Sequence, residues 1–316
     1  MLRSALRRLA WLPIILFGAS LLVFVLLRTL PGQDPAKAIA GQGATPEDYQ
    51  RIRVQLGLDK PLWEQYTTWL RDVASGEFGR EYRSDRPVSE EFARRFPATI
   101  QIIGLGLFFA VLFGIGFGII SAMWRNSPID YFVRIFAVLG SSIPEFFLLS
   151  LLIIIPSFLW NYAAPSGGYQ PFFEDPQRYI EHMLPPALII GIGGSAGLMR
   201  LTRTTMLEVL QSDYVRTARS KGLRQHTVIL THALKNAGTP IATAVGTAFI
   251  GVFGGSIIVE QVMSIQGLGA WFFQAALIRD FPVVQFLALY TATVVILINL
   301  IVDLSYGYID PRVRYS

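Results

Sequence analysis

Six long apolar runs restrict what this chain can fold into more than any other feature of its sequence. Each approaches or exceeds the length of roughly 20 apolar residues that a helix needs to cross a bilayer. Hydrophobic residues make up 52% of the 316 residues and charged residues only 16%, which fits a membrane protein and not an ordinary soluble domain. The sequence therefore predicts an all-α membrane protein with six transmembrane helices, near residues 9–30, 98–124, 132–160, 183–201, 239–260 and 281–303.

A cleavable signal peptide is the alternative for the first run. Basic residues precede the run, and "AIAG" (Ala38–Gly41) resembles a small-residue cleavage site. The apolar stretch is too long for a signal sequence, and this site lies about ten residues beyond its end. We therefore expect a retained helix.

The basic residues predict the orientation of the helices. The two short outer loops hold only Arg178 and Arg279 if the N-terminus is cytoplasmic. This is the positive-inside bias, so we expect a multi-pass membrane protein with both termini in the cytoplasm. The net charge of +5 then reflects topology and not nucleic-acid binding. The inner segments hold Arg3, Arg7, Arg8, Arg125, Arg134, Arg200, Arg203, Arg216, Arg219, Lys221, Arg224, Lys235, Arg312 and Arg314.

Residues 31–97 form the one sizeable segment outside the predicted spans. "TPEDYQRIRVQLG" predicts a short helix that Thr45 caps and Gly57 closes. A second helix is predicted from Pro61 to Gly76, with one apolar stripe. That stripe either packs on the outer ends of the membrane helices or belongs to a lobe that also receives a soluble partner. It consists of Leu62, Tyr66, Trp69 and Val73.

Glycine pairs spaced four apart occur in three of the runs. Such pairs let helix backbones approach closely in lipid, so they favour a tightly packed bundle. Chance in glycine-rich spans is the alternative for any one of them. The pairs are Gly114 with Gly118, Gly193 with Gly197, and Gly251 with Gly255.

Glu145 is the only acidic residue that we expect deep within a span, where a charge is costly and often functional. It either lines a polar pathway or pairs with a neighbour. Glu260 and Asp303 lie near span ends, where water can reach them, and Arg28 and Arg134 have side chains long enough to extend toward the interface.

Motifs for chemistry carried out by this chain are not apparent. The sequence contains neither GxxxxGK[ST] nor HExxH, and it has no cysteine. His182, His226 and His232 are the only histidines, and all lie outside the predicted spans. We therefore expect no enzyme activity, no bound metal and no cofactor of its own.

The basic segment "SDYVRTARSKG" between the fourth and fifth runs predicts a short, well-delimited helix. Ser212 is a suitable N-cap, Asp213 lies in the favourable first turn, and Arg219 and Lys221 fall in the last turn. Gly222 suits the position that follows a helix end. The predicted helix covers residues 213–221.

One face of this helix is small in its middle. Tyr214, Thr217, Ala218 and Lys221 share a side at helical spacing, whereas Arg216 and Arg219 point away from it. The basic residues also hold the loop in the cytoplasm, and a helix on lipid headgroups is an alternative with a meagre apolar face. A helix that docks on a protein fits better.

The segment "DYVRTARSKGL…HALKNAGTP" resembles the cytoplasmic signature loop of ABC-importer permeases. Arg216, Thr217 and Ala218 match that loop's "EAA" element, with the different first two letters usual in one subgroup, and Gly222 matches its glycine. The subgroup is the dipeptide/oligopeptide/nickel permease family, in its first-subunit form. Further segments match in order: "LGLDKPLWEQYTTWL" (56–70), "GEFG" (76–79), "SIPEFFL" (142–148), "VEQVMSIQGLG" (259–269), "RDFPVVQ" (279–285) and "YIDPRVR" (308–314).

Three outer segments depart from the family pattern. Gln33 interrupts the usual "PGDPA", Gln266 stands where a proline usually precedes "GLG", and the text from Arg80 to Arg86 is unusual. These departures concern substrate class and partner docking more than fold or mechanism.

The resemblance implies the type I ABC-importer permease fold, with an extracytoplasmic lobe between helices 1 and 2. It divides the chain into helix 1 with the N-terminus (1–30), the lobe (31–97), a transmembrane domain (98–305, with a coupling loop at 202–238) and a cytoplasmic tail (306–316). It also implies four kinds of partner: a second homologous permease subunit, two cytoplasmic ATPase subunits or domains, an extracytoplasmic substrate-binding protein, and the lipid bilayer. The partner ATPases would use ATP and Mg. The resemblance further implies a bacterial or archaeal cytoplasmic (inner) membrane as the location.

In that picture the 213–221 helix contacts an ATPase through Asp213, Tyr214, Arg216, Thr217, Ala218, Lys221 and Gly222. Members of the family import di- or oligopeptides, nickel chelates or oligosaccharides, and peptides are our first expectation. A stand-alone secondary transporter would favour inverted repeats and several intramembrane ion-binding groups, and neither is apparent. An intramembrane protease would need catalytic groups that the spans do not offer.

Overall fold

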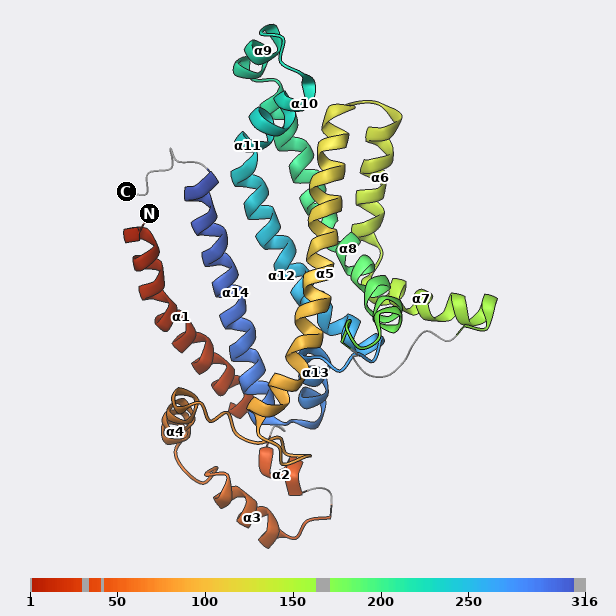
Figure 1. Ribbon diagram of the computed structural model, residues 1–316. Coiled ribbons are helices and arrows are strands. Elements are labelled where there is room, and N and C mark those ends of the chain that lie inside the picture. The colour runs from red at the N-terminus through yellow and green to blue at the C-terminus, as the bar shows by residue number, and fades with distance from the viewer. Residues whose placement is uncertain (1, 30–33, 41–42, 163–170, 310–316) are drawn as a thin grey trace. The chain divides into compact units, whose positions relative to one another are not determined.

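The computed structural model describes residues 2–29, 34–40, 43–162 and 171–309, and there the chain consists of helices and connections with one isolated antiparallel bridge, Arg80 to Pro87 (Figure 1). Gln33, Gly41 and the end of the tail lie outside the described residues. The helices are α1 (Leu2–Thr29), α2 (Pro35–Ala40), α3 (Pro46–Gln55), α4 (Leu62–Ser75), α5 (Val88–Met123), α6 (Pro128–Ser142), α7 (Glu145–Trp160), α8 (Pro176–Leu210), α9 (Asp213–Ser220), α10 (Gln225–Thr227), the π-helix η1 (Val228–Ala233), α11 (Leu234–Asn236), α12 (Gly238–Val262), α13 (Leu268–Ile278) and α14 (Phe281–Ile309).

The chain forms two compact units. The first unit contains Met1–Leu6, Ala98–Gln266 and Leu297–Ser316, and the second contains Arg7–Pro97 and Gly267–Ile296. Within the described residues, five helices are long and apolar enough to cross a membrane. These are Trp11–Thr29, Val88–Met123, Pro176–Leu210, Gly238–Val262 and Phe281–Tyr306.

The third expected span is broken, so the prediction of one helix over 132–160 is wrong. The axes of α6 and α7 differ by 93°. Ile143 between them has extended backbone angles, φ −91° and ψ 122°. Pro144 follows it, and a proline lacks an N–H group and disfavours helical geometry in the residue before it. The proline therefore ends α6, and α7 starts in a new direction.

Close packing in the first unit depends on one of the three glycine pairs. A methyl group at Gly114 would lie 2.7 Å from Leu198 of α8, and one at Gly118 would lie 2.6 Å from Thr202. This pair thus brings α5 and α8 together as predicted. Gly197 and Gly251 have no such neighbour within 4 Å, so the other pairs are not helix contacts of this kind.

The helices of the lobe begin and end where local residues predict. The Thr45 hydroxyl accepts a hydrogen bond from the N–H of Asp48 at 3.2 Å, which caps α3. Gly57 and Gly76 follow the ends of α3 and α4 with φ of 64° and 85°, a conformation that glycine adopts at little cost.

The apolar stripe of α4 packs on α1, which confirms the first of the two alternatives for it. Tyr66 is buried, and its ring lies 5.2 Å from that of Phe24 in an edge-on arrangement. Its hydroxyl shares a hydrogen bond of 2.8 Å with Ser20. Leu62 remains 51% exposed, so the stripe is buried mainly at its centre.

The outer connections contain more helix than the sequence indicated. The segment 261–280, expected as a loop, contains α13, and α8 begins at Pro176 instead of near 183. Trp271 of α13 is 1% exposed and lies in a core with Val88, Leu268 and Val283. An apolar helix of 11 residues is too short to span a bilayer, so it forms part of the protein core of the second unit.

Candidate functional site

The helix α9 has one of its two predicted end signals. Gly222 follows it with φ of 78°, and its N–H donates to the carbonyl of Arg219 at 2.9 Å, as expected. Ser212 has the extended backbone of an N-cap, but its side chain makes no capping bond. Its hydroxyl donates instead to the carbonyl of Val209 at the end of α8, so the predicted side-chain cap is wrong.

The inner face of α9 is anchored on the chain itself. Val215 is fully buried and Ala218 is 8% exposed, and both pack against the end of α8 and Val228 of η1. The expectation that Ala218 is part of an outward, small face is therefore wrong. Val215 and Ala218 lie three apart, so burying the valine also carries the alanine inward.

The outer face of α9 is exposed. Tyr214 is 44% exposed, and Thr217 and Lys221 are exposed beside it. The pair Asp213–Arg216 is long, at 3.8 Å, and has side chains 99% and 73% exposed, so it contributes little stability.

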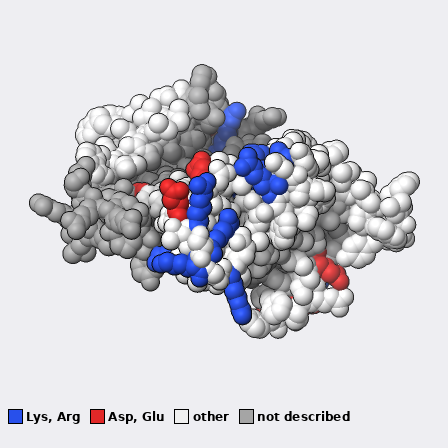
Figure 2. Space-filling model, turned by 90° about the horizontal axis from the view of Figure 1, so that it is seen from above, with Lys and Arg blue, Asp and Glu red and all other residues white. Residues whose placement is uncertain are grey.

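Positive charge surrounds this exposed face. Figure 2 looks onto the α9 end of the molecule and shows Lys and Arg side chains gathered there, with fewer acidic ones. The exposed cations in and after α9 are Arg216, Arg219, Lys221 and Arg224.

The connection after α9 provides its support. Val228, Ile229 and Ala233 of η1 are buried, and Ile229 and Ala233 share a core with Met206 of α8. The π-helical turn inserts an extra residue in a helical stretch, a feature that often marks functional positions. Helix α9 is therefore packed against α8 and η1.

A buried ion pair that the sequence did not reveal lies between α6 and α8. Arg203 donates to both oxygens of Asp130, at 2.8 and 2.9 Å, and Asp130 is 0% exposed. Ser121 at the end of α5 and the N–H of Asn126 also donate to this carboxylate. Arg203 lies about two turns before α8 ends at Leu210, so this clamp joins the α5–α6 connection to the part of α8 that leads to α9.

The local signal for Asp130 was present but incomplete. It stands in the first turn of a helix capped by Ser127, where an acidic residue is ordinary. Its partner lies 73 residues away, and only the tertiary structure identifies it.

Glu145 occupies a niche between two helices. It is the first residue of α7, and a methyl group at Gly193 of α8 or Gly255 of α12 would lie 2.7 or 2.5 Å from its carboxylate oxygens. The glycines therefore make room for the carboxylate.

Glu260 lies deeper than expected. It is 0% exposed and accepts a hydrogen bond from Thr99 at 2.7 Å, so the expectation that water reaches it is wrong. Helix α12 buries this carboxylate against α5, where a hydroxyl partner offsets part of the cost of burial.

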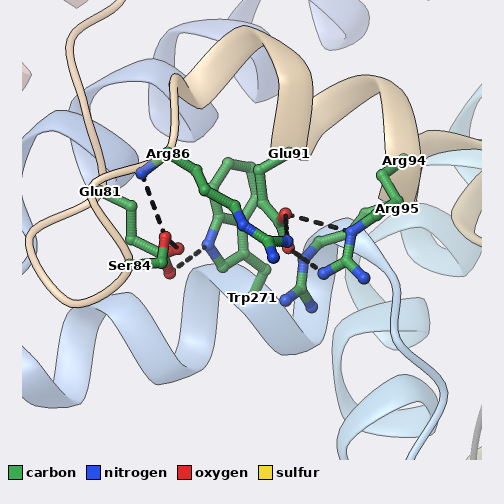
Figure 3. A network of polar contacts seen from close by, with 7 residues as sticks. All are labelled: Glu81, Ser84, Arg86, Glu91, Arg94, Arg95 and Trp271. Atoms are coloured by element: carbon green, nitrogen blue, oxygen red, sulfur yellow. Dashed lines mark hydrogen bonds and ion pairs between the residues drawn. The ribbon is translucent and has the colours of Figure 1, made fainter.

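In the second unit, the atypical segment 80–86 is fixed by a polar network (Figure 3). The indole N–H of Trp271 donates to Glu81 at 3.2 Å, and the guanidinium of Arg95 lies 5.5 Å from the Trp271 ring centre. Arg94 and Arg95 both donate to the buried carboxylate of Glu91. The unusual sequence therefore specifies an ordered turn.

Asp280 holds the same segment from the start of α14. The N–H of Tyr82 donates to its Oδ2 at 2.8 Å. Burial raises the pKa of Asp280 to about 6, although this donor favours the ionised form.

Two family models match nearly the whole chain. The model described as "Binding-protein-dependent transport system inner membrane component" matches residues 114–315, and the model of the N-terminal part of such membrane components matches residues 1–103. The chain belongs to this family. It is a permease subunit of an ABC importer, a transport component and not an enzyme, and it is a multi-pass inner-membrane protein.

Relatives and solved structures agree with this assignment. The permease is 41% identical over 305 residues to a putative peptide transport system permease protein of Brucella abortus (strain 2308), which covers 96% of each chain. It is 38% identical over 339 residues to the dipeptide transport system permease protein DppB of Escherichia coli (strain K12), over 100% of each chain. A chain of the inward-facing MetNI methionine ABC transporter superposes with a TM-score of 0.54 at 17% identity, over 69% of this chain and 96% of that one. The fold is that of type I ABC-importer permeases.

Proposed function

We propose that this permease forms half of the translocation pathway of an importer for di- or oligopeptides. A second, similar permease subunit completes the pathway, an extracytoplasmic binding protein delivers the peptide, and two cytoplasmic ATPase subunits or domains bind and hydrolyse ATP with Mg. The peptide assignment is supported by the Brucella abortus and Escherichia coli relatives, which are named as peptide and dipeptide permeases and match over almost their full lengths.

The mechanism that we propose rests on the way in which α9 packs against the rest of the chain. Its apolar side is anchored by Val215 and Ala218, while its other side is exposed and surrounded by cations. We propose that an ATPase binds this exposed side in the cytoplasm, which is the side of the membrane that the positive-inside distribution predicts for both termini. Closure of the ATPases on ATP would move α9, and the bundle would switch between its two access states.

The proposed contact surface consists of Tyr214, Thr217 and Lys221, with Asp213 and Arg216 at its edge. Ala218 contributes by anchoring α9, and Gly222 by ending it. Glu145, in its glycine niche, is our candidate for lining the pathway.

A bulky residue on the outer face of α9 tests the coupling. In proteoliposomes containing the complete importer, Thr217→Trp should lower ATP-dependent peptide uptake at least about tenfold, because it blocks close approach at a central contact. Thr68→Trp, at an exposed threonine of the helix α4, is the matched control and should leave uptake unchanged. Normal coupled uptake by Thr217→Trp would exclude this surface.

The end of α9 gives a second, subtler test. Gly222→Val places a β-branched residue at φ 78°, which costs about 1–2 kcal/mol of local strain, whereas Gly222→Asn tolerates that conformation better. We expect the valine variant to assemble but to hydrolyse ATP with little uptake, and the asparagine variant to stay coupled.

Competition of uptake by unlabelled dipeptides, nickel chelates and oligosaccharides identifies the cargo class. Competition by nickel chelates alone or by oligosaccharides alone would reject the peptide assignment.

A further inference from the structure

Arg28, near the end of α1 in the second unit, carries donors without acceptors. Within the described residues, its Nε and Nη1 atoms are buried without a hydrogen-bond partner, and its guanidinium lies 5.5 and 5.7 Å from the ring centres of Phe24 and Phe281. The nearby carboxylate of Asp34 instead accepts from the N–H of Ala36 and from the Tyr49 hydroxyl. Buried guanidinium donors without an acceptor are costly, so these two atoms indicate an anionic ligand.

A cavity of about 560 Å³ lies beside Arg28, which is a size typical of small-molecule sites. Its walls come from α4, from the ordered turn at 77–82 and from the start of α14. Gln285 also lines it, and the Nε2 atom of that side chain is likewise buried without an acceptor. Two orphaned donors from different helices thus line one cavity.

The same cavity has an acidic wall. Asp72 and Glu77 line it, and neither forms an ion pair with another described residue. The other charges there are engaged, because Arg80 pairs with Asp85 and Glu81 accepts from Trp271. Among the described residues, the cavity therefore offers a cation and two carboxylates that have no ion-pair partner, which suits a ligand that carries both signs of charge.

An apolar groove of about 210 Å³ adjoins Arg28 on its other side. Leu21 and Val25 of α1 and Leu62 and Trp63 of α4 line it, and these side chains are 38%, 43%, 51% and 68% exposed. The part of α1 that is apolar enough to span a membrane has only 11% of its most apolar window buried in the protein, so the groove opens on an exposed apolar face of that helix.

We propose that the second unit binds a phospholipid with a primary ammonium headgroup, such as phosphatidylethanolamine. One acyl chain lies in the groove between α1 and α4. The phosphate accepts hydrogen bonds from Arg28 and Gln285, and the ammonium group faces Asp72 and Glu77. The ligand must combine an apolar chain, an anion and a cation in that order, and a phospholipid of this class does so. An acyl chain also suits a groove on the exposed apolar face of a helix that is long enough to span the bilayer.

Native mass spectrometry of the delipidated, complete importer tests the proposal. The complex is exposed to vesicles of phosphatidylethanolamine, phosphatidylglycerol or phosphatidylcholine, and the lipid retained per complex is counted. We expect phosphatidylethanolamine to be retained best, because phosphatidylglycerol has no cation and phosphatidylcholine has no N–H donor for a carboxylate. Arg28→Gln should lower its retention about tenfold or more, the usual effect of losing a charge-assisted hydrogen bond.

Two further variants make the result decisive. Arg71→Gln removes an exposed arginine of α4 outside the cavity and should change nothing. Val25→Trp fills the groove without touching a charge and should reduce retention even if Arg28→Gln fails to assemble. Three outcomes would each overturn the proposal. The first is equal retention of phosphatidylethanolamine by the wild type, Arg28→Gln and Val25→Trp. The others are equal or better retention of phosphatidylglycerol, and retention of phosphatidylethanolamine by the isolated chain but not by the complex.

Discussion

The clamp between Asp130 and Arg203 permits the sharpest test of how the first unit is held together. We consider Asp130→Asn, which keeps the shape of the side chain and removes its charge. The asparagine oxygen can still accept from Ser121 or from the N–H of Asn126, but its amide group opposes the donors of Arg203. The variant therefore removes the ionic, two-point contact with Arg203 and also the longer ion pair of Asp130 with Arg134, at 3.6 Å.

The expected loss follows from burial and geometry. Removing one partner of a buried ion pair costs about 3–5 kcal/mol when the remaining charge is stranded. The side chain of Arg203 is 20% exposed, so water can solvate part of its guanidinium, and the lost contact is a pair of charge-assisted hydrogen bonds. We therefore expect Asp130→Asn to lower the free energy of unfolding by about 2–3 kcal/mol.

A double-mutant cycle measures this contact directly. The permease in mixed micelles is unfolded with denaturing detergent and followed by its helical circular dichroism, for Asp130→Asn, Arg203→Gln and the double variant. The coupling energy should be about 2 kcal/mol, because both single variants break the same contact. The exposed pair Lys60–Glu64, at 2.8 Å, is the control and should show no measurable coupling. A coupling energy below about 0.5 kcal/mol for Asp130 and Arg203 would refute the clamp.

Two further predictions concern packing and titration. Gly118→Leu should destabilise the permease by about 2–3 kcal/mol in the same assay, because its Cβ would lie 2.6 Å from Thr202, whereas Gly116→Leu on the same helix has nothing within 4 Å and should be tolerated. Burial raises the pKa of Asp280 from its ordinary value of 3.8 to about 6, so the folded protein holds this proton more tightly than the unfolded chain does. The stability that Asp280 contributes is therefore present below about pH 4 and is lost as the pH rises through 6. The loss is at most about 3 kcal/mol. Asp280→Asn should abolish this part of the pH dependence measured by thermal unfolding and be as stable as wild type or more so at pH 8; an unchanged pH profile would mean that Asp280 is not its source.

The helix ends show how far local sequence carries a prediction. Thr45, Gly57, Gly76 and Gly222 act on backbone groups within a few residues, and each stands where the sequence placed it. Ser212 is the exception, because its hydroxyl donates to the carbonyl of Val209 and makes no capping bond. Side-chain capping is thus predictable except where the hydroxyl bonds to a backbone carbonyl of the preceding helix instead.

At the candidate site, the local sequence pattern did not predict which side of α9 is buried. The sequence identified α9 and its cations, yet periodicity over eight residues did not decide which side faces the protein. Val215 and Ala218 are inside because α8 and η1 present an apolar surface to them. The docking surface that we propose therefore depends on a contact that no spacing within α9 reveals.

The sequence by itself determined that this chain is a membrane protein of helices, which segments are apolar enough to span, and where a short basic helix interrupts them. These properties depend on the composition and spacing of adjacent residues. Only the tertiary structure decided that α6 and α7 diverge at Pro144, that Asp130 meets Arg203, and that Glu145 fits between Gly193 and Gly255. Such contacts join residues far apart in the chain, and a lipid-facing and a protein-facing side of an apolar helix look alike until the neighbouring helix is in place.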